Sequence, residues 1–203
     1  SASPPFATKA KRFSPSGNAR MWCWIVVSTT SLSAAPTLSK YRGFEFGMTV
    51  TTVARIAGIS AEPRTVHQRP ELIQELMWLP PRLGNPADGG DSAQKVLFTF
   101  YNNQLSRIVV SYDRRRTEGL TAEDLVEAIA ATYGLAPIPA LGMTALTAGP
   151  NADDKTVAHW EDPQYSITLF RSKYLSTFGL VLLSKRLDGL AVLANAEAAL
   201  LDE

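Results

Sequence analysis

The chain is short of the residues from which most catalytic and metal sites are built. Among its 203 residues there is one cysteine, Cys23, and there are two histidines, His67 and His159. One thiol cannot form a disulfide within the chain, and a zinc site needs three or four ligands at a spacing that two distant histidines do not supply. We therefore expect no disulfide framework, no metal site and no cofactor.

The chain also lacks an excess of charge of either sign. Lys and Arg total 20 against 19 for Asp and Glu, so the net charge is +1. Nucleic-acid-binding domains are usually far more basic, and we expect no nucleic-acid partner. The run Arg114, Arg115 and Arg116 is a candidate contact for an anionic partner, although three arginines in a turn are more often a solubilising run.

Common enzyme motifs are absent as well. The chain has no Gly-x-Ser-x-Gly nucleophile elbow and no HExxH pair, and the glycines of residues 84–90 are not followed by Gly-Lys-Ser/Thr. One enzyme hypothesis stays open beside a non-catalytic function. It is a small hydrolase-like site that uses His159 with Glu161 or Asp162, in a cleft between two halves of the chain under residues 135–155.

The N-terminal segment has the layout of an export signal. Residues 1–40 are predicted to be disordered, since they begin Ser/Pro-rich, and residues 1–35 hold four basic residues and no acidic one. Residues 21–27, MWCWIVV, form a short apolar run that leads into small residues ending at Ala35. This order predicts a signal peptide cleaved near Ala35 and a periplasmic or secreted protein. The run is shorter than the roughly 20 residues of a membrane span, so no transmembrane helix is expected.

Three other interpretations of this segment stay open. The first is a transit peptide, because the segment is free of acid and rich in serine. The second is a true start at Met21 with a truncated signal, and the third is a loose tail with an exposed apolar knot. If the segment is not a signal, the protein is cytoplasmic.

The clearest folding pattern is a hairpin that leads into a helix. Residues 96–101 and 105–112 are rich in β-branched and aromatic residues and flank Asn102-Asn103, a pair that tolerates the positive φ of a tight turn. A helix is predicted between Thr121, which has Asp124 in capping-box position, and Gly134.

The remaining elements follow the same logic. Residues 73–79 suit either a helix or a strand, and we choose a strand because the Trp-containing segment 156–161 is its counterpart. The other predictions are strands at 41–46, 165–171 and 178–185, a helix from Thr49 to Gly58, loops at 80–92 and 135–155, and an Ala-rich helix at 187–201 with Leu187, Leu190, Ala191, Ala194, Ala198 and Leu201 on its buried face.

The order of motifs along the chain suggests an internal duplication. Gly47-Met48-Thr49, a helix, Gly58 and a Trp-containing strand are matched by Gly119-Leu120-Thr121, a helix, Gly134 and a Trp-containing strand. We predict an α+β fold in which two tandem helix-plus-three-strand units form one antiparallel sheet of about six strands, with helices on one face and an additional C-terminal helix. The predicted boundaries are 41–113 for unit one, 114–186 for unit two and 187–203 for the C-terminal helix, all within one domain, 41–203.

These Gly-x-Thr, helix and glycine segments resemble the modules of the beta-lactamase inhibitor protein and of small outer-membrane assembly lipoproteins. The match covers Gly47 to Gly58 and, less fully, Gly119 to Gly134. The chain departs from those families because it has no disulfide pair and no lipid-attachment cysteine. The resemblance implies a helix-on-sheet binding module outside the cytoplasm.

The predicted function is therefore a protein-binding or envelope-assembly module without catalytic activity, with another protein of the cell envelope as partner. A purely structural domain is a further alternative. Aromatic residues on an uncovered sheet face are common binding hot spots, although most strand aromatics fill the core. The candidate binding residues are Trp78, Tyr101, Tyr112, Trp160, Tyr165, Arg114, Arg115 and Arg116.

Overall fold

The structure is a computed structural model that describes residues 38–81, 93–138, 154–173 and 176–201. The predicted signal segment with its cleavage site near Ala35 lies outside the described residues, and so does most of the loops predicted at 80–92 and 135–155. All described residues belong to one compact unit.

The first half of the described chain contains six strands and one helix. Asn102 and Asn103 both adopt positive φ, at 46° and 64°, as the predicted hairpin turn requires. The side chain of Asn103 also accepts a hydrogen bond from the backbone N–H of Val50 at 3.1 Å, so the turn holds the start of the first helix. The elements are β1 (Lys40–Tyr41), β2 (Phe44–Glu45), α1 (Val50–Ala57), β3 (Arg64–His67), β4 (Ile73–Trp78), β5 (Ala93–Tyr101) and β6 (Gln104–Tyr112).

The second half has a helix, three strands and the C-terminal helix. The predicted capping box is confirmed, since Thr121 accepts from the Asp124 N–H and the Asp124 carboxylate accepts from the Thr121 N–H. The elements are α2 (Ala122–Tyr133), β7 (Lys155–Glu161), β8 (Tyr165–Arg171), β9 (Phe178–Ser184) and α3 (Lys185–Leu201).

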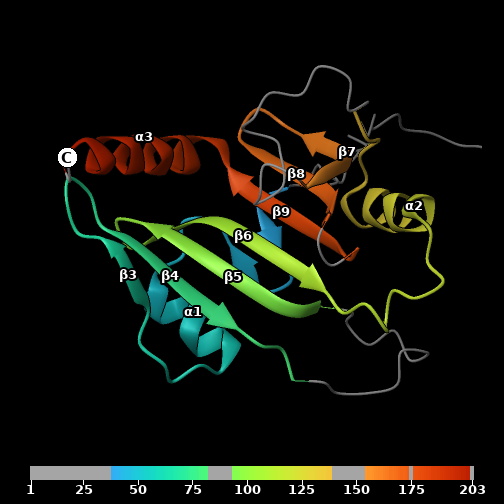
Figure 1. The fold of residues 1–203 in the computed structure, drawn as a ribbon, viewed down its shortest axis with the longest axis horizontal. Helices are drawn as coiled ribbons and strands as arrows, with labels where there is room; N and C mark the ends of the chain where they lie inside the picture. Colours follow the sequence, from blue (N-terminus) through green and yellow to red (C-terminus); the bar gives the residue numbers. More distant parts are fainter. Residues whose placement is uncertain (1–37, 82–92, 139–153, 174–175, 202–203) are drawn as a thin grey trace, which may run out of the picture. The chain divides into compact units, whose positions relative to one another are not determined.

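Seven strands form one antiparallel sheet in the order β3-β4-β5-β6-β9-β8-β7 (Figure 1). The predicted α+β class with an antiparallel sheet is thus confirmed, and residues 73–78 form a strand. The prediction missed β3, which adds a seventh strand, and it placed a strand at residues 41–46 where the chain forms the separate two-stranded ribbon of β1 and β2. The two meanders β4-β5-β6 and β7-β8-β9 meet where their last strands pair.

The two halves share the geometry of their helix ends. Gly47 and Gly119 both have φ of 87°, and the glycines that end α1 and α2, Gly58 and Gly134, have φ of 65° and 66°. These left-handed angles favour glycine because a Cβ atom is strained there. The duplication itself stays a hypothesis, and this parallel is the observation that motivates it.

The sheet buries different residues on its two faces. Alternate residues of each strand point to opposite faces, so Phe98 and Trp160 lie on the face covered by α1 and α2, within the main core. Helix α3 packs on the opposite face, where Ala191 and Ala194 contact Ile73. Leu190, which was predicted to face the sheet, is instead 38% exposed, because the sheet-facing positions fall one residue away along α3.

Candidate functional site

The face of the sheet that carries α3 changes character from one edge to the other. Cross-strand partners share a face, so the pairing registers define one row of side chains that crosses six strands. The row consists of Met77, Leu97, Val109, Val181, Thr168 and His159. The β4, β5 and β6 members are exposed or half-buried, and the β9, β8 and β7 members are at most 4% exposed.

The exposed end of the row is apolar. Met77 is 57% exposed, and Leu97 and Val109 are half-buried. We call these three residues the open sheet patch. Val109 also packs against the buried cluster of Phe170, Val181 and Leu183, so the patch is the uncovered continuation of a packed apolar surface.

Helix α3 borders the open sheet patch. The Arg107 guanidinium, one row away from the patch, donates from Nε and Nη2 to the two carboxylate oxygens of Asp188 at 2.6 and 2.7 Å. The Asp188 side chain is only 7% exposed, so this forked pair is largely withdrawn from water and holds the start of α3 on β6. Val192, one turn further along α3, is 40% exposed and lies on the same side of the helix as Asp188.

The buried end of the row contains His159. Its Nδ1 lies 3.0 Å from the Thr168 hydroxyl, and its Nε2 lies 3.8 Å from the Glu161 carboxylate. Burial lowers the pKa of His159, and the Glu161 carboxylate only partly opposes this. The Lys185 ammonium donates to Glu161 at 2.6 Å and lowers the pKa of that carboxyl group. The imidazole is 3% exposed and makes structural contacts on both of its nitrogens.

The other residues of the enzyme hypothesis form a turn. The Asp162 carboxylate accepts hydrogen bonds from the backbone N–H groups of Gln164 and Tyr165, both at 2.7 Å. This Asx-type arrangement closes the connection between β7 and β8. Asp162 therefore orders a surface turn, and within the described residues no hydrogen bond or ion pair joins it to His159.

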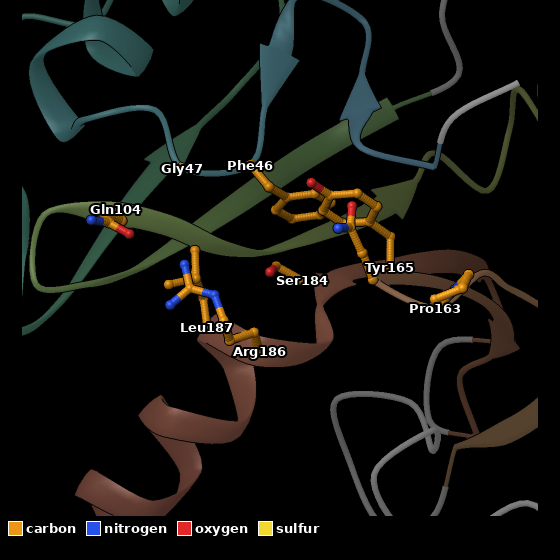
Figure 2. Close-up of a pocket in the computed structure, with 9 residues that line it drawn as sticks. Phe46, Gly47, Gln104, Pro163, Tyr165, Ser184, Arg186 and Leu187 are labelled. Carbon is orange, nitrogen blue, oxygen red and sulfur yellow. The ribbon is translucent and has the colours of Figure 1, made fainter. Parts of the chain in front are cut away.

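A pocket of ≈ 340 Å³ lies where the two halves meet at one end of the sheet. In Figure 2 the rings of Phe46 and Tyr165 lie against each other on one side of the hollow, and Gln104 and Arg186 lie on another. The two rings stack with centroids 5.4 Å apart and an interplanar angle of 14°. The volume is at the lower limit of ligand pockets, so the hollow can take one side chain or a small molecule. Its lining is Phe46, Gly47, Gln104, Pro163, Gln164, Tyr165, Ser184, Arg186 and Leu187.

The aromatic residues predicted to bind a partner do not gather on the open sheet patch. Trp160 is fully buried in the main core, and among the residues that the structure describes its indole N–H has no hydrogen-bond partner. Trp78 packs edge-on against Phe44 at 5.3 Å on the helix-covered face. Tyr101 lies on the other face and packs against the cluster formed with α3. Of the aromatic residues predicted to bind a partner, only Tyr165 lines the pocket.

Tyr112 belongs to a group of tyrosines beside the main core. Burial raises the pKa of Tyr112, and the neighbouring hydroxyls of Tyr41 and Tyr133 raise it further. Burial also raises the pKa of Tyr133 to about 12. The Arg42 guanidinium stacks 5.0 Å above the Tyr41 ring. These phenols therefore stay protonated and contribute packing rather than acid–base chemistry.

The three arginines lie in the turn after β6. The Asp113 carboxylate accepts the Arg115 backbone N–H at 2.8 Å, and the Thr117 hydroxyl donates to the Asp113 carbonyl at 3.0 Å. Arg114 and Arg115 are exposed, and Arg116 is half-buried. The turn is ordered by hydrogen bonds within residues 113–117, and none of the three arginines belongs to the open sheet patch.

The residues of the open sheet patch were missed by the sequence analysis. Met77 and Leu97 each stand next to a larger aromatic residue, Trp78 and Phe98, that points to the other face. The sequence did carry a signal, because apolar residues occupy positions on both faces of β4 and β5. An apolar outer face on an antiparallel strand indicates a second covering layer or a partner.

The fold and the patch together describe an α+β protein with a seven-stranded antiparallel sheet and an exposed apolar strip beside its C-terminal helix. Comparisons with protein-family models, with curated proteins and with solved structures gave no match. Within the part of the chain that the structure describes, no helix is long and apolar enough to cross a membrane. The same residues contain no group of three or more potential metal ligands.

Proposed function

We propose that the protein is a protein-binding or envelope-assembly module without catalytic activity, and that it binds another protein through the open sheet patch. The observation that carries the proposal is that exposed Met77 and half-buried Leu97 and Val109 form a strip continuous with a buried apolar cluster. Contiguous exposed apolar surface of this kind is typical of interaction sites.

The surroundings of the patch suit a protein partner. Exposed Lys95 and half-buried Glu75 flank Leu97 and Met77 along their strands, so the apolar centre has charged neighbours of both signs. Protein interfaces commonly combine an apolar centre with a polar rim. Val192 of α3 adds apolar surface on a second side.

The envelope location rests on two further considerations. The N-terminal segment has the order of an export signal, and the two Gly-x-Thr helices resemble extracytoplasmic binding modules. The matching φ angles at the ends of α1 and α2 show that the two helices of this chain end alike. The proposed partner is therefore another protein of the envelope, and neither a nucleic acid nor a cofactor takes part.

A hydrolase-like site at His159 finds less support. A general base must come within hydrogen-bonding reach of a substrate, and the His159 ring is 3% exposed with both nitrogens facing protein side chains. For this reason the non-catalytic function is the one we propose.

Site-specific photocrosslinking in the native host tests the proposed surface. A photoreactive amino acid at Met77 should give one defined crosslinked species, and the same group at exposed Glu127 of α2, on the other face, should not. The partner identified by crosslinking is then purified, and its affinity for variants of this protein is measured. Met77→Asp should weaken the affinity about tenfold or more, and Glu127→Lys should leave it unchanged. Equal crosslinking from both positions contradicts the proposal.

The location is tested separately. The intact mass of the protein recovered from the host, together with the cell fraction that contains it, reports whether residues before about Pro36 are removed. A chain that retains them in the cytoplasm contradicts export and leaves the proposed surface to be judged by the crosslinking result alone.

A further inference from the structure

Helix α3 carries two lengthwise stripes of side chains. The stripe that faces the sheet is small and buried, and it consists of Leu187, Ala191, Ala194 and Ala198. A second stripe begins one residue earlier and is exposed throughout. It consists of Arg186, Leu190, Leu193, Glu197 and Leu200.

The exposed stripe is more apolar than a solvent-facing helix surface normally is. Leu190, Leu193 and Leu200 are 38%, 68% and 74% exposed. From Gly189 to Leu201, Glu197 is the one charged residue in the sequence. Helix α2 differs, because its exposed positions include Glu123, Asp124 and Glu127. The two stripes lie about 100° apart around the helix, because one begins one residue before the other, and a helix that is apolar beyond its buried stripe is normally packed there as well.

The spacing of the exposed stripe indicates what covers it. Its members are separated by four, three, four and three residues, which is the heptad spacing by which one helix packs along another. The sheet-facing stripe has the same spacing and is already covered. The exposed stripe therefore fits a second helix that runs along α3.

The stripe is complementary to itself in the antiparallel direction. If two copies of α3 pack about a twofold axis between Ala191 and Val192, Leu190 of each copy meets Leu193 of the other, and Arg186 meets Glu197 of the other. Neither Arg186 nor Glu197 has an ion pair or side-chain hydrogen bond within the described residues. A twofold axis repeats each contact, so the dimer would contain two Arg186–Glu197 ion pairs around a leucine centre.

We infer that the exposed stripe of α3 binds a second copy of this chain and forms an antiparallel, twofold-symmetric dimer. This goes beyond the proposed function, because the surface is distinct from the open sheet patch and the partner is the protein itself. A 17-residue helix is about 25 Å long, so the contact is smaller than a standard protein interface. We therefore expect a reversible dimer that forms at high protein concentration.

Molar mass measured against concentration tests the inference on the full chain. The experiment spans roughly 1 to 200 µM, a range suited to a weak interface, under reducing conditions so that Cys23 cannot link copies. The mass should rise from 22.1 kDa toward twice that value. Leu193→Lys should keep the chain monomeric. Leu79→Lys, at a position that follows β4 and is 66% exposed, should dimerise like the wild type.

Charge reversal tests the antiparallel register. Arg186→Glu or Glu197→Arg alone sets like charges opposite each other twice and should raise the dissociation constant about tenfold. The double variant R186E/E197R restores opposite charges and should recover dimerisation. A wild-type chain that stays monomeric throughout, or a double variant no better than the singles, overturns the inference. Unchanged thermal unfolding shows that every variant is folded.

Discussion

The two ends of one row across the sheet differ in what covers them. Val181 and His159 are 4% and 3% exposed at one end, and Met77 is 57% exposed at the other. The row lies on a single face, and its members at both ends include apolar residues. The difference shows that the apolar pattern of a strand indicates which residues can be buried. The neighbouring elements decide which of these residues are in fact buried.

The largest expected effect comes from placing a charge at each end of the row. Val181→Asp puts an unpaired carboxylate into a packed apolar cluster and should cost more than about 4 kcal/mol or prevent folding. Met77→Asp keeps its charge in water and should cost less than about 1 kcal/mol. Urea unfolding of both variants makes the comparison, and similar losses would contradict the distinction between the two ends.

The second-largest loss of unfolding free energy is expected from the Arg107–Asp188 ion pair, which joins the two halves of the described chain. Arg107→Ala leaves the Asp188 carboxylate, 7% exposed, without its forked partner, and we expect a loss of about 3 kcal/mol. The matched control is Arg64→Ala, whose contact with Glu75 is 4.0 Å long and whose side chain is 79% exposed. This control should lose less than about 0.5 kcal/mol in the same unfolding experiment. A small loss for Arg107→Ala would mean that α3 is held without the pair.

A smaller loss of stability is expected at the glycines that end α1 and α2, where the two halves have the same backbone geometry. Gly58→Ala and Gly134→Ala each force a Cβ atom into the left-handed region at φ of 65° and 66°, and each should cost about 1 kcal/mol. Because the two angles are the same within a degree, the two losses of unfolding free energy should agree. A clear difference between them would show that the two helix ends are not equivalent in their surroundings.

The smallest effect is a pH dependence at the buried end of the row. Burial lowers the pKa of His159 below its ordinary value, so the unfolded chain takes up this proton more readily than the folded one. The contribution of neutral His159 to the free energy of unfolding is fully present above about pH 6.5, and it is lost as the pH falls through the lowered pKa. Glu161, Lys185 and Thr168 face the ring, and Glu161 reduces the shift.

The variant His159→Gln should remove this part of the acid sensitivity, and His67→Gln should leave it in place. Unfolding free energies measured from about pH 7.5 down to pH 5, on both sides of the ordinary histidine pKa, make the comparison. An unchanged slope in H159Q would mean that other groups cause the acid loss.

Local structure was largely predictable because it depends on neighbouring residues. Asn102-Asn103 predicted the hairpin turn, and Thr121 with Asp124 predicted the start of α2. These features need only the backbone and side chains within a few residues. The strand β3 was missed because Arg64–His67 is short and its residues are exposed or half-buried, which leaves little apolar signal.

The candidate site was predicted less well, since it depends on contacts between distant segments. Trp160 was selected as an exposed aromatic and lies in the core, whereas Met77 was not selected and is exposed. Both stand in strands that are apolar on two sides, and for such strands alternation alone does not tell which face meets water.

The sequence by itself determined most of the secondary elements, the caps of α1 and α2, the Asn102-Asn103 turn and the antiparallel class, because hydrogen bonds and conformational preferences within short segments decide these. The tertiary structure decided that β6 pairs with β9, that Arg107 meets Asp188 across 81 positions, and that α3 covers only part of one face. These outcomes depend on which surfaces can be removed from water together. That choice is made by the whole chain, and it left Met77 and Leu193 exposed.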